Sequence, residues 1–430
     1  MRKKILLNIV VISVLFVTSI FPLANITAKS TNSEIFLPTP LSVNMTYREA
    51  IMSRCSVRTF DQMELVGDEE LSTILWAAYG YRDDGSRTVH GIDGLYSTVI
   101  YVFRKEATYT YNSFNHSLVL FKEGDLRRIV NWQHIAPIQL GLVWDTTKNN
   151  DANYSTVEMG EIGQNIYFVA KALGLSTVTA GLTGFDEIDL PNNEIGRIVM
   201  PLGYPQKTQV FEYRPNLISL LPRIQDSNRN LKAVIEDRKE EKSFIGEITR
   251  QDLSQLLWAS YGFSYLLDKT ESATNEVERH RTVPSAACLY PLTMYAITES
   301  AIFRYFPHIL HLNPYHNDPY YSTNWKFPVV TFLLPIRSGD YREEIAQASS
   351  QPNISSAPLI LVSVLPFSSS YPVTWYWYFE SGASAYNTML ESTILNLHAG
   401  IVKPIDISSV KSILRLSNDT IPLIIIPIGQ

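Results

Sequence analysis

The sequence has few residues of several kinds, and each scarcity excludes a class of protein. Its only cysteines are Cys55 and Cys288, too few for a disulfide framework or a cysteine-rich zinc site. The 8 histidines are scattered without a His-Glu-X-X-His spacing, so the pattern predicts no metal site. The net charge is −6 and no basic stripe occurs, so nucleic acid is not an expected partner. No paired carboxylates stand in a context typical of glycoside hydrolysis.

What is present is typical of a globular protein. Hydrophobic residues make up 45% and charged residues 18% of the 430 residues. This length is enough for two ordinary domains, each with a well-buried core.

The N-terminus differs in kind from the rest. Arg2, Lys3 and Lys4 precede a mostly apolar run over 5–24, and residues 26–28 (Ile-Thr-Ala) fit a cleavage site. This pattern is typical of an export signal. The run is also long enough to span a bilayer, so residues 1–28 are predicted to be either a cleaved signal peptide or an uncleaved N-terminal anchor. Both place the remainder outside the cytoplasm, secreted or membrane-anchored. Asn-X-Ser/Thr sequences begin at Asn44, Asn115, Asn153, Asn353 and Asn418. They fit the glycosylation acceptors of an exported chain, and chance occurrence from the amino-acid composition explains them equally well.

The remainder of the chain repeats itself. "LSTILWAAYG" (71–80) resembles "LSQLLWASYG" (253–262), and an Arg-Thr-Val block occurs at both 87–89 and 281–283. Further pairs keep the same order, with slowly growing offsets. We therefore predict a tandem duplication, with one domain over 29–225 and another over 226–430. A fused pair that was once a homodimer would form composite sites from both halves and be a monomer by default.

Hydrophobic periodicity predicts an α+β architecture in each half. Helices are expected from Asp68 to Gly80, over 251–261 and over 160–173, the last ended by Gly174. Strands are expected at 98–103, 137–144, 292–297, 358–365 and 421–428. Helices and strands in separate groups favour an α+β sandwich in each half.

A basic strip follows a short helix at "YREAIM". Arg54, Ser56 and Arg58 alternate, so on extended backbone they project to one side. Two guanidiniums and a hydroxyl form a good clamp for a phosphate monoester. The alternative is an ordinary basic helix end, where arginine complements the helix dipole.

Several motifs in a fixed order resemble the nitroreductase superfamily, and within it the SagB-type dehydrogenases, which are similar to peptide azoline oxidases. They are Arg-X-Ser-X-Arg, "LLWAxYG", "RTVPSAACLYPL", "QNIYFVAKALGL" and "PLGYP". The resemblance implies two tandem FMN-dependent nitroreductase-like domains that form an intramolecular pseudo-two-fold dimer, with flavin between them. It implies that one half supplies Arg54, Ser56, Arg58, Gly174 and Lys207, and the other supplies Pro284, Ser285 and Ala286.

The second possible composite site would take its phosphate clamp from the second half and its ring-binding segment from the first, and these residues suit a flavin less well. Its clamp would be "DRKEEKSF" (237–244), where Glu240 and Glu241 would repel a phosphate. Asn396 replaces Gly174, and His90-Gly91-Ile92-Asp93 replaces the Pro-Ser-Ala segment. We therefore predict one working flavin site and one vestigial site.

The resemblance implies ping-pong chemistry on FMN, with NAD(P)H as the reductant or a peptide azoline as the electron donor. The second substrate would be a small molecule or a peptide. Tyr290 and His280 flank the Pro-Ser-Ala block and could donate a proton, but packing and surface roles fit them as well. Cys55 and Cys288 are better explained as small buried side chains that fill space in the core than as a redox pair. The competing hypothesis is a binding or structural module that has lost its flavin, which an exported location would favour.

Overall fold

The computed structural model describes residues 34–213, 217–239, 243–270, 278–309, 329–366 and 374–430. The chain separates into two compact units, Met1–Asn32 and Ser33–Gln430, and the described residues all belong to the second. The predicted signal or anchor over 1–28 lies outside them. Within the described ranges, no helix has the length and apolar character needed to cross a membrane.

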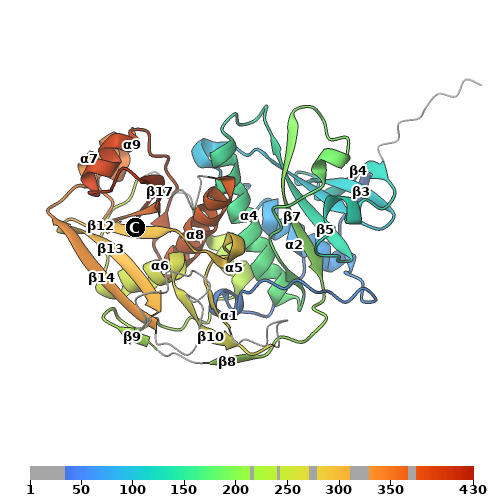
Figure 1. Ribbon diagram of the computed structural model, residues 1–430, viewed down its shortest axis with the longest axis horizontal. Helices are drawn as coiled ribbons and strands as arrows, with labels where there is room; N and C mark the ends of the chain where they lie inside the picture. Colours follow the sequence, from blue (N-terminus) through green and yellow to red (C-terminus); the bar gives the residue numbers. More distant parts are fainter. Residues whose placement is uncertain (1–33, 214–216, 240–242, 271–277, 310–328, 367–373) are drawn as a thin grey trace, which may run out of the picture. The chain divides into compact units, whose positions relative to one another are not determined.

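Two seven-stranded sheets of matching order form the framework (Figure 1). The order of the first is β1-β4-β3-β2-β5-β7-β6, and that of the second is β9-β14-β13-β12-β15-β17-β16. The first comprises β1 (Glu34–Phe36), β2 (Thr98–Phe103), β3 (Ala107–Asn112), β4 (Ser117–Glu123), β5 (Ile138–Asp145), β6 (Ser176–Thr177) and β7 (Glu194–Gly203). The second comprises β9 (Leu217–Ser219), β12 (Thr293–Ile297), β13 (Ala301–Ile309), β14 (Val329–Ser338), β15 (Leu359–Pro366), β16 (His398–Ala399) and β17 (Thr420–Gly429). Equal strand order confirms the predicted α+β fold with two tandem halves.

The long helices α2, α4, α6 and α8 lie between the sheets, with α4 and α8 at the centre of Figure 1, whereas α7 and α9 lie on the outer side of the second sheet. The first half contributes α1 (Tyr47–Ser53), α2 (Asp68–Tyr79), α3 (Arg127–Val130) and α4 (Ala152–Ala172). The second contributes α5 (Leu231–Asp237), α6 (Arg250–Tyr261), α7 (Arg342–Ala348), α8 (Trp375–Ile394) and α9 (Ile407–Ile413). Short 3-10 turns lie at η1 (Ile92–Gly94), η2 (Phe185–Glu187), η3 (Ala286–Cys288) and η5 (Pro352–Ile354).

The helix predicted over 160–173 begins earlier than its sequence pattern suggested. The side chain of Asp151 accepts hydrogen bonds from the backbone N–H groups of Asn153 and Tyr154, at 3.1 and 3.4 Å. This N-cap satisfies donors that a helix leaves unpaired at its start, so α4 begins at Ala152. Its end is as predicted: Gly174 follows with φ of +78°, a left-handed conformation that suits glycine.

Two glycines allow α4 and α8 to cross in close contact. A Cβ on Gly160 would lie 2.1 Å from the carbonyl oxygen of Phe379, and one on Gly382 would lie 2.0 Å from that of Val157. Both distances are far inside van der Waals contact, so only glycine fits at either position. The two positions correspond in the two copies, which places the pseudo-two-fold axis at this crossing.

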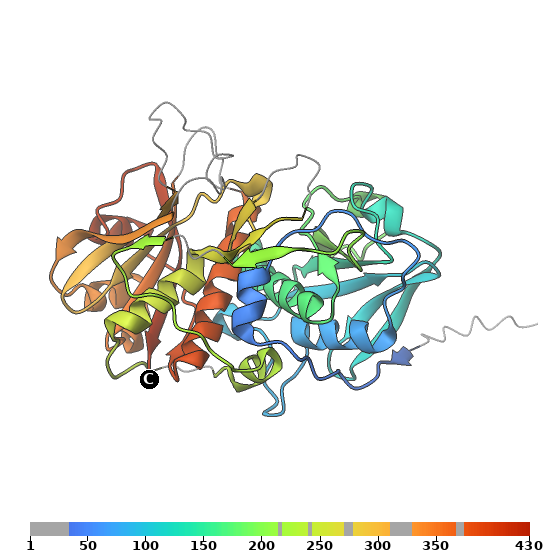
Figure 2. The same cartoon turned by 90° about the horizontal axis from the view of Figure 1, so that it is seen from below.

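Segments near the predicted junction pair with the opposite half. β9 lies within the domain predicted over 29–225, yet it pairs in parallel with β14 of the second sheet. β8 (Phe211–Tyr213) likewise pairs with β10 (Phe263–Asp268), which pairs in turn with β11 (Glu278–Arg281). In Figure 2, α1 (blue) lies beside α8 (red), where Arg48 forms a buried ion pair with Glu391 at 2.7 Å. The halves are therefore interlocked by backbone pairing as well as by side-chain packing.

Candidate active site

A cavity of about 400 Å³ lies where the two halves meet. Five residues predicted from the sequence line it: Ser56 and Arg58 from the first half, and Pro284, Ser285 and Ala286 from the second. The other lining residues are Gln133, His134, Tyr167, Val178, Thr179, Ala180, Gly181, Leu182, Ala287, Trp375, Tyr376, Phe379 and Glu380. The structure thus brings the arginine-bearing strip and the Pro-Ser-Ala segment to one cavity.

The first-half wall is held by a small hydrogen-bond network. The hydroxyls of Ser56 and Tyr167 lie 3.0 Å apart, and the Tyr167 hydroxyl accepts a hydrogen bond from the backbone N–H of Thr179 at 2.9 Å. Arg58 is exposed at the cavity and lies near His134. Burial, with a further effect of the Arg58 charge, lowers the pKa of His134, so Arg58 is the main cation on this wall.

Arg54 lies beside the cavity but does not line it. Its Nε and Nη2 donate to the carbonyl oxygen of Arg281 at 3.3 and 3.1 Å, and its guanidinium lies 5.2 Å from the ring centre of Tyr167. Its buried Nη1 has no hydrogen-bond partner among the described residues. Arg238, the equivalent residue of the second half, donates in the same way to the carbonyl oxygen of Arg87 at 3.0 Å. The arginine–carbonyl contact therefore joins the halves at both positions.

Gly174 and Lys207, also predicted for the site, are exposed and do not line the cavity. The suggested proton donors lie elsewhere too. Tyr290 packs edge-to-face against Tyr261, with ring centres 6.4 Å apart, and His280 contacts Asp268.

The Pro-Ser-Ala segment runs into a turn with unusual backbone conformations. Ala287, Cys288 and Tyr290 all have positive φ, at 50°, 57° and 48°. Such angles are costly for residues with a side chain and persist only where the surroundings enforce them. Here the Ser285 hydroxyl accepts from the backbone N–H of Tyr290 at 2.9 Å, which closes the turn.

Glu380 is the functional candidate that the sequence did not reveal. It lies on α8, is 1% exposed and lines the cavity. Its carboxylate accepts hydrogen bonds from Ser285 Oγ, at 2.6 Å, and from the Tyr261 hydroxyl. Burial raises the pKa of Glu380 to about 7, although the two donors and the charge of Arg281 oppose that rise. A single glutamate within the apolar run "WYWYFESGAS" was the only available signal.

Three aromatic residues of α8, Trp375, Tyr376 and Phe379, also line the cavity. Gly181 lies directly against them, since a Cβ there would be 2.5 Å from Tyr376 Cε1. Aromatic faces opposite polar groups suit a flat ligand with a charged tail.

The equivalent region of the other half carries different side chains. Lys403 takes the place of Gly181, with its ammonium 4.3 Å from the ring centre of Tyr154 and 2.6 Å from Asp151 Oδ2. His90 takes the place of Pro284, and its backbone N–H, which proline lacks, donates to Glu161 Oε2 at 2.6 Å. Of the predicted second clamp, residues 240–242 lie outside the described residues. The two regions have therefore diverged in the side chains that surround them.

The two sheets of equal strand order and the cavity formed by both halves define the class: a duplicated α+β protein with a composite site. A family model described as the nitroreductase family matches residues 51–195 and 246–430, one stretch in each half. The chain therefore belongs to the nitroreductase family.

Individual proteins described as nitroreductases are also similar to this chain. A Methanocaldococcus jannaschii protein, assigned to the nitroreductases by its name, is 31% identical over 192 residues, which cover 40% of this chain and 96% of that protein. A solved Anabaena variabilis structure, also described as a nitroreductase, aligns with a TM-score of 0.63 at 14% identity, covering 84% of this chain and 88% of that one. That likeness shows the fold alone, and it extends over both halves.

The cavity fits a flavin. Its volume lies within the range of cofactor sites, about 300 to 1,000 Å³. It offers an aromatic wall for a flat ring, Arg58 for a phosphate, and small residues at Ala286 and Ala287. The unpaired Nη1 of Arg54 provides a further buried donor at its edge.

Proposed function

We propose that the protein is an FMN-dependent oxidoreductase with one intact flavin site, formed by both halves. The observation that carries this proposal is the contrast between Gly181 and Lys403. Gly181 lines the cavity and packs against Tyr376, whereas Lys403, at the matching position, places its ammonium over the ring of Tyr154 and beside Asp151.

The residues present have distinct tasks in such a site. Arg58 and Ser56 would hold the phosphate end of FMN, and the Pro284–Ala286 segment with the aromatic wall would hold its ring. Bound FMN would supply the two-electron redox chemistry, as cofactors do in such enzymes. The protein would exclude water through Trp375 and Tyr376, and Glu380, whose pKa is raised to about 7, could both donate and accept a proton near neutral pH.

The finer assignment is the SagB-type branch, supported by the order of the sequence motifs. We propose NAD(P)H as the reductant, or a peptide azoline as the electron donor, and a small molecule or peptide as the substrate. The protein would act outside the cytoplasm, as a monomer whose former dimer interface is internal. The basic and apolar N-terminal 28 residues support that location.

The full-length protein should retain FMN through gel filtration and show the visible absorption of a bound flavin at about one per chain. Arg58→Glu should abolish retention, because it places an anion beside the phosphate. Lys242→Glu alters the residue at the equivalent sequence position of the second half and should leave retention unchanged. A colourless wild-type protein after incubation with FMN would support the flavin-free module instead, and equal loss in both variants would contradict a single site.

A further inference from the structure

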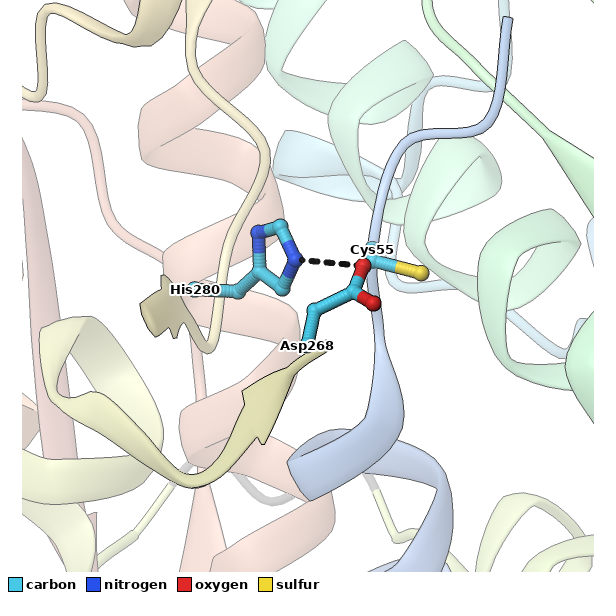
Figure 3. A group of neighbouring side chains, drawn as sticks. All are labelled: Cys55, Asp268 and His280. Carbon is cyan, nitrogen blue, oxygen red and sulfur yellow. Dashed lines mark hydrogen bonds and ion pairs between the residues drawn. The ribbon is translucent and has the colours of Figure 1, made fainter. Parts of the chain in front are cut away.

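Cys55, Asp268 and His280 come together in the structure (Figure 3). None of the three lines the composite cavity, although Cys55 directly precedes Ser56, which does. Cys55 belongs to the strip after α1, Asp268 ends β10, and His280 lies in β11. One ligand atom from each residue lies within 4.8 Å of the others. The cluster joins the first half to the small sheet that β10 and β11 form, so its members come from distant parts of the chain.

The donor set is that of a transition-metal site. Thiolate sulfur, imidazole nitrogen and carboxylate oxygen are the ligands that zinc takes, usually in a tetrahedron. Bonds of about 2.0 to 2.3 Å place neighbouring ligand atoms about 3.3 to 3.8 Å apart. His280 Nε2 and Asp268 Oδ2 already lie 3.2 Å apart. A shift of the Cys55 sulfur by about 1 Å, through rotation of its side chain, would bring it to the spacing of a tetrahedral site.

The surroundings orient the ligands in the manner of metal sites. The backbone N–H of Thr270 donates to Asp268 Oδ1 at 2.9 Å, which leaves Oδ2 for the metal. Gln209 Nε2 donates to Cys55 Sγ at 2.7 Å, a contact that would stabilise a bound thiolate. Cys55 is 7% exposed, and the side chains of His280 and Asp268 are 14% and 16% exposed. The cluster is therefore largely shielded while keeping limited access to solvent.

We propose that Cys55, Asp268 and His280 bind one zinc-type divalent cation, with an exogenous ligand in the fourth position. The ion would fasten the β10–β11 pair to the strip that carries Ser56 and Arg58, and so stabilise one wall of the composite cavity. Lys171 lies nearby, hydrogen-bonded to Gln209 Oε1, and its charge reduces the affinity. The second half has Lys239 at the position of Cys55, so the site belongs to one half only.

The test uses full-length protein, stripped with a chelator and titrated with Co²⁺ and then Zn²⁺. Wild-type protein should bind one Co²⁺ per chain, with thiolate-to-cobalt charge-transfer absorption and the visible bands of a tetrahedral ion. Zn²⁺ should displace it, and elemental analysis of the product should show one zinc per chain. Flavin is removed beforehand so that its absorption does not overlap.

Cys55→Ser and His280→Gln should each lower the affinity for Co²⁺ at least tenfold. Cys55→Ser should also remove the charge-transfer band, and His280→Gln should remove the visible spectrum of a tetrahedral ion. Cys288→Ser is the matched control, because it removes the other cysteine, and its titration should match that of wild type. Thermal unfolding without metal shows whether each variant is folded. Binding below one ion in five chains, or loss of the band in Cys288→Ser but not in Cys55→Ser, would overturn the proposal.

Discussion

Gly181 and Lys403 occupy equivalent places in the two halves, and each contacts the equivalent tyrosine of the central helices, Tyr376 and Tyr154. Gly181 lies against the Tyr376 ring beside an open cavity, whereas Lys403 covers the Tyr154 ring and pairs with Asp151. Equivalent positions of the two copies thus contact equivalent tyrosines through side chains of opposite size and charge.

Gly181→Lys should abolish FMN retention, because the new Cβ would collide with the Tyr376 ring and displace it from the cavity lining. Lys403→Gly should leave retention unchanged and should cost about 1 kcal/mol of stability at most, since its ion pair is partly exposed. Flavin content after gel filtration and urea unfolding measure the two effects. Retention by Gly181→Lys at wild-type level would show that the flavin does not use this cavity.

The stability of the protein should depend on pH through Glu380. Burial raises the pKa of this carboxyl to about 7 in the folded state, above the value of 4.5 for a free side chain. The folded state therefore binds more protons between these values, so this contribution favours folding at low pH and is lost as pH rises through 7. Between pH 5 and 8 the loss should be about 2 kcal/mol.

Glu380→Gln should remove that part of the pH dependence, as measured by urea unfolding at both pH values. The same variant should keep FMN but lose turnover, with a flattened pH profile, if Glu380 holds the reacting proton. Glu158→Gln is the matched control on α4, where the carboxylate accepts from the backbone N–H groups of Ser97 and Thr98. It should lower stability without changing the pH profile of turnover.

Arg54 and Arg238 allow their structural role to be separated from cofactor binding. Arg238→Ala removes a buried, charge-assisted hydrogen bond between the halves and should cost about 1.5 to 3 kcal/mol without affecting FMN retention. Arg54→Ala should cost a similar amount and should also weaken retention, because its Nη1 is free to contact a ligand. Unaltered FMN affinity in Arg54→Ala would restrict Arg54 to joining the halves.

Gly382→Ala should destabilise the whole fold, because the added methyl group would collide with the carbonyl of Val157 at the helix crossing. Overpacking of this kind costs about 1 to 3 kcal/mol. Gly67→Ala is a suitable control, since its Cβ would meet only the flexible ends of Glu69 and Glu70 at 3.4 Å or more. A single unfolding transition, shifted only in the Gly382 variant, would confirm that the halves unfold together.

The sequence by itself determined the duplication, the fold class and most of the helices and strands. These features depend on local periodicity and on capping residues, and both are visible along the chain. It also selected Ser56, Arg58, Pro284, Ser285 and Ala286, because the motifs that contain them are short and ordered.

Tertiary structure alone decided what each side chain faces. Arg54 alternates with Arg58 in the sequence, but the carbonyl of Arg281 holds its guanidinium at the edge of the cavity. Glu380 and the Cys55–Asp268–His280 cluster depend on contacts between segments far apart in the chain, and no local pattern encodes such contacts. Burial then sets their chemistry, since the loss of water that raises the pKa of Glu380 exists only once both halves have packed around it.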